Sequence, residues 1–237
     1  TENKSTTEAF VVPVTGGSAV QTFNKDSVMK DKNISPNGKY IIYNKEVKLL
    51  NVTGKDLYPE LTKSNAYIFD TLGYRHWDKW NDGKFNHVFI APVNKIAAEK
   101  DLMPGESFDA PQKPFGGDED YVWSPDSQNV VYVSKKKYGK DYALSTNTDL
   151  YQYNVSSGAT TNLTNGMMCY DINPAYNKQG TLAWLSMRRE GFEADKQDLI
   201  IMTGNSKTNL TAARDDIHVD GFRWSTDGNR LFFWETQ

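Results

Sequence analysis

Charged side chains gather in one short stretch whose composition suits it to binding a charged ligand. Residues 188–195 read Arg-Arg-Glu-Gly-Phe-Glu-Ala-Asp. Carboxylates can pair with a free amino group, and guanidinium groups can hold a carbonyl or carboxylate by forked hydrogen bonds. The candidate binding residues are therefore Arg188, Arg189, Glu190, Glu193 and Asp195. The alternative for the same residues is a solvated, self-neutralising loop.

A second stretch, between residues 74 and 80, combines aromatic and basic side chains. Aromatic residues together with arginine are the usual anchors of an interface. The candidate interface residues are Tyr74, Arg75, His76, Trp77 and Trp80. The alternative is a local cluster in which Arg75 stacks on a tryptophan and fills an irregular part of the fold.

Other groups give no sign of a reactive centre. No Gly-x-Ser-x-Gly motif occurs, so no residue is assigned as a catalytic nucleophile. The spacing of His76 and His87 fits no zinc pattern, and we expect neither a metal nor a cofactor. The run 118–120 (Asp-Glu-Asp) is expected to be an exposed connection, and the run 135–137 (three lysines) a solvated hairpin end.

Composition limits the function classes. The chain has 237 residues, a net charge of -3 and 13% aromatic residues. This charge gives no basic face for nucleic acid, and no apolar run reaches the roughly 18–20 residues that span a bilayer. The one cysteine, Cys169, excludes an intrachain disulfide and is expected to be a small buried side chain. The polar start, Thr1 to Glu8, has no apolar h-region, so we expect no signal peptide within these residues, and one removed before Thr1 stays open.

A repeat organises the rest of the chain. The motif Trp-Ser-Pro-Asp at residues 123–126 precedes an apolar stretch, and so do Trp-Ser-Thr-Asp at 224–227 and Ser-Pro-Asn-Gly at 35–38. Asn173 and Pro174 are interpreted as a degraded copy. Pro, Gly and Asn set the backbone angles of tight turns, so each motif predicts a turn between two strands.

The second half of the unit also recurs. Asp149-Leu150 and Asp198-Leu199 each begin a strand that is followed by a glycine turn and a Leu-Thr pair. Leu150 and Leu199 lie 49 positions apart. A period of about 40–50 residues with four short strands is the signature of a propeller blade.

We therefore predict an all-β fold, a β-propeller of four-stranded antiparallel blades with an incomplete ring. The expected blades span residues 9–56, 57–112, 113–165, 166–212 and, incompletely, 213–237. Because the last strand would leave an open edge, we expect the natural polypeptide to continue. The loops 71–86, 135–148 and 187–197 should lie on one face, because each follows the second strand of its blade.

The repeat resembles the TolB-type propeller and the N-terminal propeller of the prolyl oligopeptidase family of serine peptidases. Three segments narrow the resemblance to bacterial dipeptidyl or acylaminoacyl peptidases of that family, namely residues 74–80, 114–120 and 138–147. The resemblance implies an α/β-hydrolase domain with a Ser-Asp-His triad, which these residues do not contain.

The resemblance also implies a function: an accessory propeller that gates and orients short peptides and is non-catalytic alone. The implied partners are short peptides and the missing C-terminal hydrolase domain, and a homo-oligomer stays open. The implied location is periplasmic or secreted. A non-enzymatic TolB-like propeller that binds protein partners is the alternative. We rank lower a propeller enzyme with its site in the central channel, because no cluster of carboxylates and histidine marks the strand starts.

Overall fold

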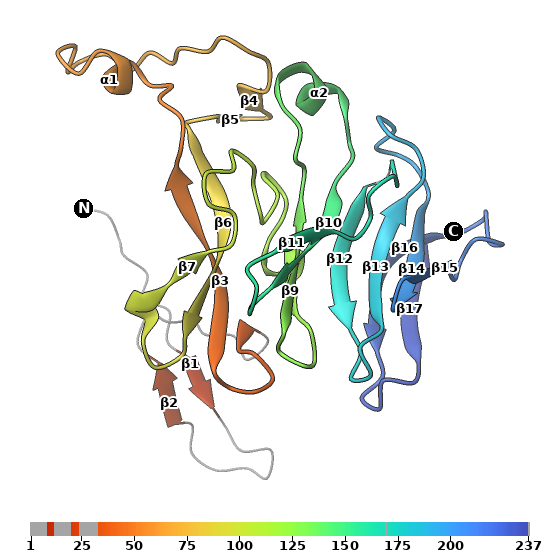
Figure 1. The fold of residues 1–237 in the computed structure, drawn as a ribbon. Helices are drawn as coiled ribbons and strands as arrows, with labels where there is room; N and C mark the ends of the chain where they lie inside the picture. Colours follow the sequence, from red (N-terminus) through yellow and green to blue (C-terminus); the bar gives the residue numbers. More distant parts are fainter. Residues whose placement is uncertain (1–8, 12–19, 24–32, 169, 237) are drawn as a thin grey trace.

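The computed structural model describes residues 9–11, 20–23, 33–168 and 170–236, which form small antiparallel sheets standing side by side (Figure 1). Cys169 and the polar start of the chain lie outside the described residues. The expected all-β class with four-stranded antiparallel sheets is confirmed. Helix occurs as short turns, among them α1 (Gly54–Leu57), α2 (Gly139–Leu144), η2 (Ile96–Ala98) and η3 (Asp118–Asp120).

Two sheets have four strands in which each strand pairs with the next along the chain. One lies within the predicted unit 113–165 and the other within 166–212. The first contains β8 (Tyr121–Trp123), β9 (Asn129–Ser134), β10 (Asp149–Asn154) and β11 (Thr160–Asn162). The second contains β12 (Asp171–Tyr176), β13 (Leu182–Met187), β14 (Gln197–Thr203) and β15 (Ser206–Asn209).

The predicted boundary between units 9–56 and 57–112 is wrong. Strand β3 (Tyr40–Lys48) pairs along its whole length with β6 (Lys84–Pro92), and β6 pairs with β7 (Lys100–Asp101). Residues on both sides of the boundary therefore belong to one sheet. The boundary fails because residues 49–83 form a long connection between β3 and β6.

This connection has local structure of its own. The side chain of Thr53 accepts a hydrogen bond from the backbone N–H of Asp56 at 3.3 Å. In return, the Asp56 carboxylate accepts one from the backbone N–H of Thr53 at 3.0 Å. This capping box starts α1. Further along, β4 (Arg75–His76) and β5 (Lys79–Trp80) form a small hairpin.

Two hairpins lie at the ends of the described chain. Near the start, β1 (Ala9–Val11) pairs with β2 (Val20–Phe23). Near the end, β16 (His218–Trp224) pairs with β17 (Leu231–Thr236), inside the predicted unit 213–237.

The repeated turns depend on a shared set of side-chain hydrogen bonds. Ser124 Oγ accepts from the backbone N–H of Asn129 at 2.9 Å, and Asp126 Oδ1 accepts from that of Gln128 at 2.9 Å. The same two contacts recur at Ser225 with Asp227 and at Ser35 with Asn37. Serine and Asp or Asn are used because their short side chains reach the backbone of their own turn.

The predicted degraded copy at Asn173 and Pro174 is not a turn, because both residues lie inside β12. The register of β12 shifts between Ile172 and Ala175, and Asn173 has a φ of 55°, which marks a bulge that tolerates a proline. The turn instead centres on Asn177, whose Oδ1 accepts from the backbone N–H of Thr181 at 2.7 Å. A single Asn side chain thus takes the place of the Ser and Asp pair.

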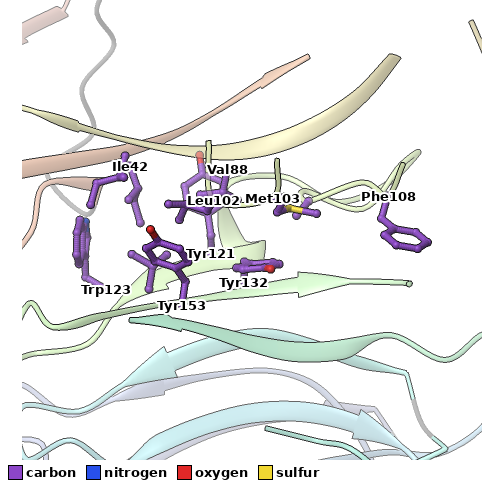
Figure 2. Close-up of a cluster of buried hydrophobic side chains, with 12 residues drawn as sticks. Ile42, Val88, Leu102, Met103, Phe108, Tyr121, Trp123, Tyr132 and Tyr153 are labelled. Atoms are coloured by element: carbon purple, nitrogen blue, oxygen red, sulfur yellow. The ribbon is translucent and has the colours of Figure 1, made fainter. Parts of the chain in front are cut away.

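The core lies between neighbouring sheets, since the middle strands are buried on both faces. Val130 and Tyr132 of β9 pack toward β3 and β6, in the cluster shown in Figure 2. Val131 and Val133 face the opposite way, toward Leu182 and Trp184 of β13 and other residues of the next sheet. A third cluster joins β13 and β14 to β16. The period-two alternation of a strand therefore places each of the two four-stranded sheets between two others.

A clasp between the third and fourth strands explains the recurring Asp-Leu and Leu-Thr pairs. Thr211 Oγ1 donates to Asp198 Oδ1 at 2.7 Å and accepts from the backbone N–H of Leu199 at 3.1 Å. Thr164, Asp149 and Leu150 make the same contacts in the preceding sheet, at 3.0 and 3.1 Å.

Candidate functional site

The long connections that follow β3, β9 and β13 in three adjacent sheets lie at the same end of the molecule. They are residues 49–83 with α1, β4 and β5, residues 135–148 with α2, and residues 188–196, and Figure 1 shows them along its upper edge. The two sequence candidates are thereby brought to one place. A cleft of 890 Å³ is lined by Arg75, His76, Trp77 and Trp80 on one side and by Ser145, Thr146 and Glu193 on the other.

The hairpin side of the cleft is built on stacked aromatic rings. Trp80 stacks on Tyr67, Phe69 and Tyr74, with ring centroids 5.9–6.2 Å apart. The Arg75 guanidinium lies 5.0 Å from the Trp80 ring, as the alternative explanation of this stretch predicts. The hairpin therefore packs internally and also presents its outer side chains to the cleft.

Trp77 and Phe115 are the most exposed aromatic side chains at this end. Trp77 is 74% exposed and Phe115 is 69% exposed, and their rings meet edge to face at 5.7 Å. Trp77 has a φ of 52°, a left-handed conformation that is unusual for a bulky residue. Arg75 Nε donates to the Trp77 carbonyl at 2.9 Å and holds this turn.

On the opposite side, Asp195 shapes its loop from within. Its side chain is 4% exposed and accepts hydrogen bonds from the backbone N–H groups of Arg188 at 2.9 Å and Arg189 at 2.7 Å. The Arg189 guanidinium binds the same carboxylate at 2.8 Å. Although burial opposes ionisation, these hydrogen bonds lower the pKa of the Asp195 carboxyl. Asp195 and Arg189 therefore already hold each other.

Arg188 is also engaged inside the protein. Its Nε lies 2.6 Å from the carboxylate of Asp198, which is 1% exposed, and its Nη1 lies 3.3 Å from Asp215. Arg189 in addition stacks on Phe192 at 4.3 Å. Of the sequence candidates, Arg188, Arg189 and Asp195 thus form the frame of the loop, as the alternative of a self-neutralising loop predicts.

Glu190 joins two of the loops. Its carboxylate accepts a hydrogen bond from the Ser145 hydroxyl and lies 3.3 Å from Lys137 Nζ. The Ser145 hydrogen bond, followed by Lys137, lowers the pKa of Glu190. Next to it, the backbone N–H of Gly191 donates to Thr146 Oγ1 at 2.9 Å. The loops 135–148 and 188–196 therefore act as one wall of the cleft.

Glu193 is the candidate carboxylate that lines the cleft. It is exposed, and no hydrogen bond or ion pair of the described residues occupies it. Lys135 lines the same cleft. Ser145, Thr146 and Lys135 were not among the sequence candidates, although their loop, 135–148, was expected on the same face as the loops that carry those candidates.

The three lysines at 135–137 are not a solvated hairpin end. Lys136 Nζ lies 2.5 Å from Glu106 and 4.1 Å from the Tyr151 ring, and its side chain is 16% exposed. Lys135 Nζ lies 4.2 Å from the Tyr142 ring, and burial lowers the pKa of Lys135 to about 8. The sequence interpretation failed because these side chains turn back onto tyrosines that a run of lysines does not reveal.

The acidic run at 118–120 is likewise more than an exposed connection. Asp120 is buried, and its Oδ2 accepts from the backbone N–H of Gln112 at 3.0 Å. Burial raises the pKa of Asp120 to about 7. Asp118 accepts a hydrogen bond of 2.7 Å from the Tyr121 hydroxyl.

The described residues hold no cluster of three or more His, Cys, Asp or Glu side chains placed to bind a metal. His87 is fully buried, with Nδ1 2.8 Å from Asp101 and Nε2 2.8 Å from the Glu106 carbonyl. His76 is exposed at the cleft. In the same described part of the chain, no helix is long and apolar enough to cross a bilayer.

Comparison with known proteins gives close sequence relatives. The chain is 41% identical over 204 residues to dipeptidyl-peptidase 5 of Porphyromonas gingivalis, which covers 84% of this chain and 29% of the relative. It is 40% identical over 171 residues to dipeptidyl-peptidase 5 of Porphyromonas endodontalis, covering 71% and 24%. The chain thus spans less than a third of the length of these relatives.

Structural comparison gives weaker similarities. TolB from Acinetobacter baumannii matches 96% of this chain and 48% of its own, at 11% identity and a TM-score of 0.46. Pyrococcus horikoshii acylaminoacyl peptidase matches 96% of this chain and 38% of its own, at 11% identity and a TM-score of 0.42. Because both TM-scores are low, we base the relationship on the sequence relatives.

No family model matches the chain. The recurring turns, the blade clasp and the stacked sheets are those of the propeller that the sequence predicts, and the identity to the Porphyromonas proteins extends over most of the chain. The chain is therefore a β-propeller-type chain of four-stranded antiparallel sheets, homologous over most of its length to part of dipeptidyl-peptidase 5.

Proposed function

We propose that this chain orients short peptides for a serine exopeptidase of the dipeptidyl-peptidase type and is not catalytic by itself. The cleft between the hairpin and the loop 188–196 carries the proposal. It has a volume of 890 Å³ and brings Arg75, Trp80, Ser145 and Glu193 together from connections that are far apart in the sequence. The relatives of the chain that are named dipeptidyl-peptidase 5 suggest the reaction, which is removal of dipeptides from a peptide.

An enzyme that removes dipeptides must recognise the free end of the peptide, because the bond it cleaves is counted from there. A carboxylate fixed on a rigid element gives such a reference point by pairing with the α-ammonium group. Glu193 suits this role because the frame of Asp195, Arg189 and Arg188 fixes the loop on which it stands. In contrast, Glu190 is held by Ser145 and Lys137.

The chemical step belongs to residues outside this chain in the proposal. A Ser-Asp-His triad of an α/β-hydrolase domain would attack the peptide carbonyl through its serine, with histidine as the base. The propeller would admit short peptides through the cleft and hold the amino end while the triad acts.

The exposed aromatics beside the cleft support a contact with another domain. Trp77 and Phe115 touch each other at the surface, and Leu144 and Tyr138 nearby are each 65% exposed. Exposed apolar groups of this kind mark interaction sites. We assign this contact to the hydrolase domain and propose a periplasmic or secreted location for the protein.

Calorimetric titration of the natural polypeptide that carries these residues tests the proposal. A tetrapeptide with a free amino end should bind at least about tenfold more tightly than its N-acetylated form, since acetylation removes the charge that Glu193 pairs with. Glu193→Gln should remove most of this difference, whereas Glu60→Gln, at an exposed position outside the cleft, should leave it intact. Equal affinity for both peptides would rule out recognition of the amino end.

A further inference from the structure

The cleft contains two cations that none of the ion pairs between described residues includes, Lys135 and Arg75. Lys136 and Lys137, which follow Lys135 directly, are each paired with a carboxylate, at 2.5 Å to Glu106 and 3.3 Å to Glu190. Lys135 therefore differs from the two lysines that follow it, because neither Glu106 nor Glu190 forms an ion pair with it. Lys135 thus lines, as a cation outside these ion pairs, the space where the proposed function places a peptide.

The position of Lys135 is fixed on several sides. Its backbone N–H donates to Gln112 Oε1 at 2.9 Å, directly after the end of β9. Gln112 is itself held, since its Nε2 donates to the Tyr142 hydroxyl at 3.2 Å and its backbone N–H donates to Asp120. The ammonium group rests 4.2 Å from the Tyr142 ring. A lysine held in this way loses little conformational freedom when it binds an anion.

The environment of Lys135 makes an anionic partner favourable. Its side chain is half-buried, and a partly desolvated ammonium without a carboxylate partner loses hydration that an anion can replace. The lowered pKa of Lys135, caused first by burial and then by Lys137, reports this cost. Glu190 and Glu193 act in the opposite direction on the same pKa, so both carboxylates lie near the ammonium group.

Arg75 adds a second charge of the same sign. Its Nε donates to the Trp77 carbonyl, and its guanidinium face lies on Trp80, so the group is oriented without being neutralised. With Glu193 as the carboxylate among the lining residues, the cleft walls carry two positive charges and one negative charge. The complementary ligand has one ammonium group and an excess of carboxylate.

We propose that the cleft selects peptides that carry an acidic side chain close to a free amino end, with Lys135 as the receptor for that carboxylate. This inference rests on the proposed function, because Glu193 is taken to hold the amino end of the same peptide. Lys135 is then a specificity-determining residue, and Arg75 contributes to the field of the cleft. Because Lys135 and Glu193 line the same cleft, the acidic residue is placed within the first two residues of the peptide in this proposal.

Titration calorimetry at low salt with two peptide pairs tests the inference on the natural polypeptide. The first pair is Gly-Glu-Ala-Ala and Gly-Gln-Ala-Ala, and the second is Glu-Gly-Ala-Ala and Gln-Gly-Ala-Ala. In at least one pair the glutamate peptide should bind about fivefold to tenfold more tightly, as expected for one charge-assisted hydrogen bond in a partly desolvated site. N-acetylation of the preferred peptide should weaken binding separately.

The variants separate the two proposals. Lys135→Gln should bring the glutamate and glutamine peptides to about equal affinity while the effect of N-acetylation remains. Lys135→Glu should reverse the order of the two affinities, and Lys140→Gln, an exposed lysine on α2, should change neither. Circular dichroism spectra matching that of the unmodified protein would show that each variant folds.

Two results would overturn the inference. If neither pair shows a preference for glutamate while N-acetylation still weakens binding, Lys135 is not a carboxylate receptor and the proposed function stands. If Lys135→Gln weakens the glutamate and glutamine peptides equally, Lys135 binds a group common to all peptides. If N-acetylation has no effect on any peptide, the proposed function fails first.

Discussion

The indole Nε1 of Trp123 donates a hydrogen bond of 2.9 Å to the backbone carbonyl of Asn33. Asn33 precedes the turn at residues 35–38, which leads into β3 of the neighbouring sheet. Both groups are buried, so the bond joins two sheets inside the core. Trp224 repeats the relationship two sheets further along the chain, where its Nε1 donates to the Ala175 carbonyl of β12 in the preceding sheet at 3.1 Å. The tryptophan of the repeated motif is thus a link between neighbouring blades.

Trp123→Phe should therefore destabilise the protein by about 1–3 kcal/mol, because it leaves the Asn33 carbonyl buried without a donor. Urea denaturation followed by circular dichroism measures the change. Trp77→Phe is the matched control, since Trp77 is 74% exposed, and it should cost at most about 0.5 kcal/mol. Equal effects of the two substitutions would contradict a role of the Trp123 indole in joining the sheets.

The buried pair of His87 and Asp101 should make stability depend on pH. Burial opposes the charged imidazolium, but the hydrogen bond and charge of Asp101 outweigh it and raise the pKa of His87. Both ring nitrogens face acceptors, which the doubly protonated ring satisfies. Because the folded pKa is raised, this stabilisation is complete below about pH 6.5 and is lost as pH rises through the folded pKa.

The measurement is the free energy of unfolding at a series of pH values between 5.5 and about 9, for the unmodified protein and for His87→Gln. The unmodified protein should lose more stability with rising pH than the variant does. The comparison removes the contribution of groups that titrate in both proteins. Parallel profiles would mean that His87 does not change its protonation on folding.

Asp120 should also make the free energy of unfolding fall as pH rises. Burial raises the pKa of its carboxyl to about 7, from about 3.9 in an unfolded chain. Its favourable contribution is complete below the unfolded value and is lost as pH rises to about 7. Asp120→Asn keeps an oxygen acceptor for the Gln112 N–H and removes the titration. At pH 8 the variant should be about 1–3 kcal/mol more stable than the unmodified protein, and near pH 4 the difference should disappear.

Asp195→Ala should disorganise the loop that carries Glu193. The substitution removes the acceptor of the Arg188 and Arg189 backbone N–H groups and of the Arg189 side chain, at an expected cost of about 2–4 kcal/mol. Trypsin should then cut after Arg188 or Arg189 at least about tenfold faster, because local opening becomes cheaper. Asp215→Ala, at a side chain 83% exposed, is the control and should leave the cleavage rate nearly unchanged.

The fold was largely predictable because its signals are local. The turn at Ser124–Asp126 and the clasp of Asp198 with Thr211 use side chains that bond within a few residues or within one sheet, so the sequence repeats wherever the structure does. The joint sheet of β3 and β6 was not predictable in this way. Their pairing spans the long connection 49–83, whose length conceals the repeat.

The candidate site was also predictable only in part. Residue types located both walls of the cleft, yet they could not separate Glu193, which lines the cleft, from Asp195, which is buried two positions later. That distinction depends on the direction of each side chain in an irregular loop. Lys135 was not predicted as a binding residue for a related reason. Only its tertiary contacts with Tyr142 and Gln112 distinguish it from the two lysines that follow.

A crystal structure of the natural polypeptide with a bound tetrapeptide that has a free amino end tests the central claim most directly. The peptide should lie in the cleft between Trp80 and the loop 188–196, with its α-ammonium nitrogen about 2.7–3.2 Å from a carboxylate oxygen of Glu193. A peptide bound with its amino end at another group, or bound outside the cleft formed by these loops, would contradict the account.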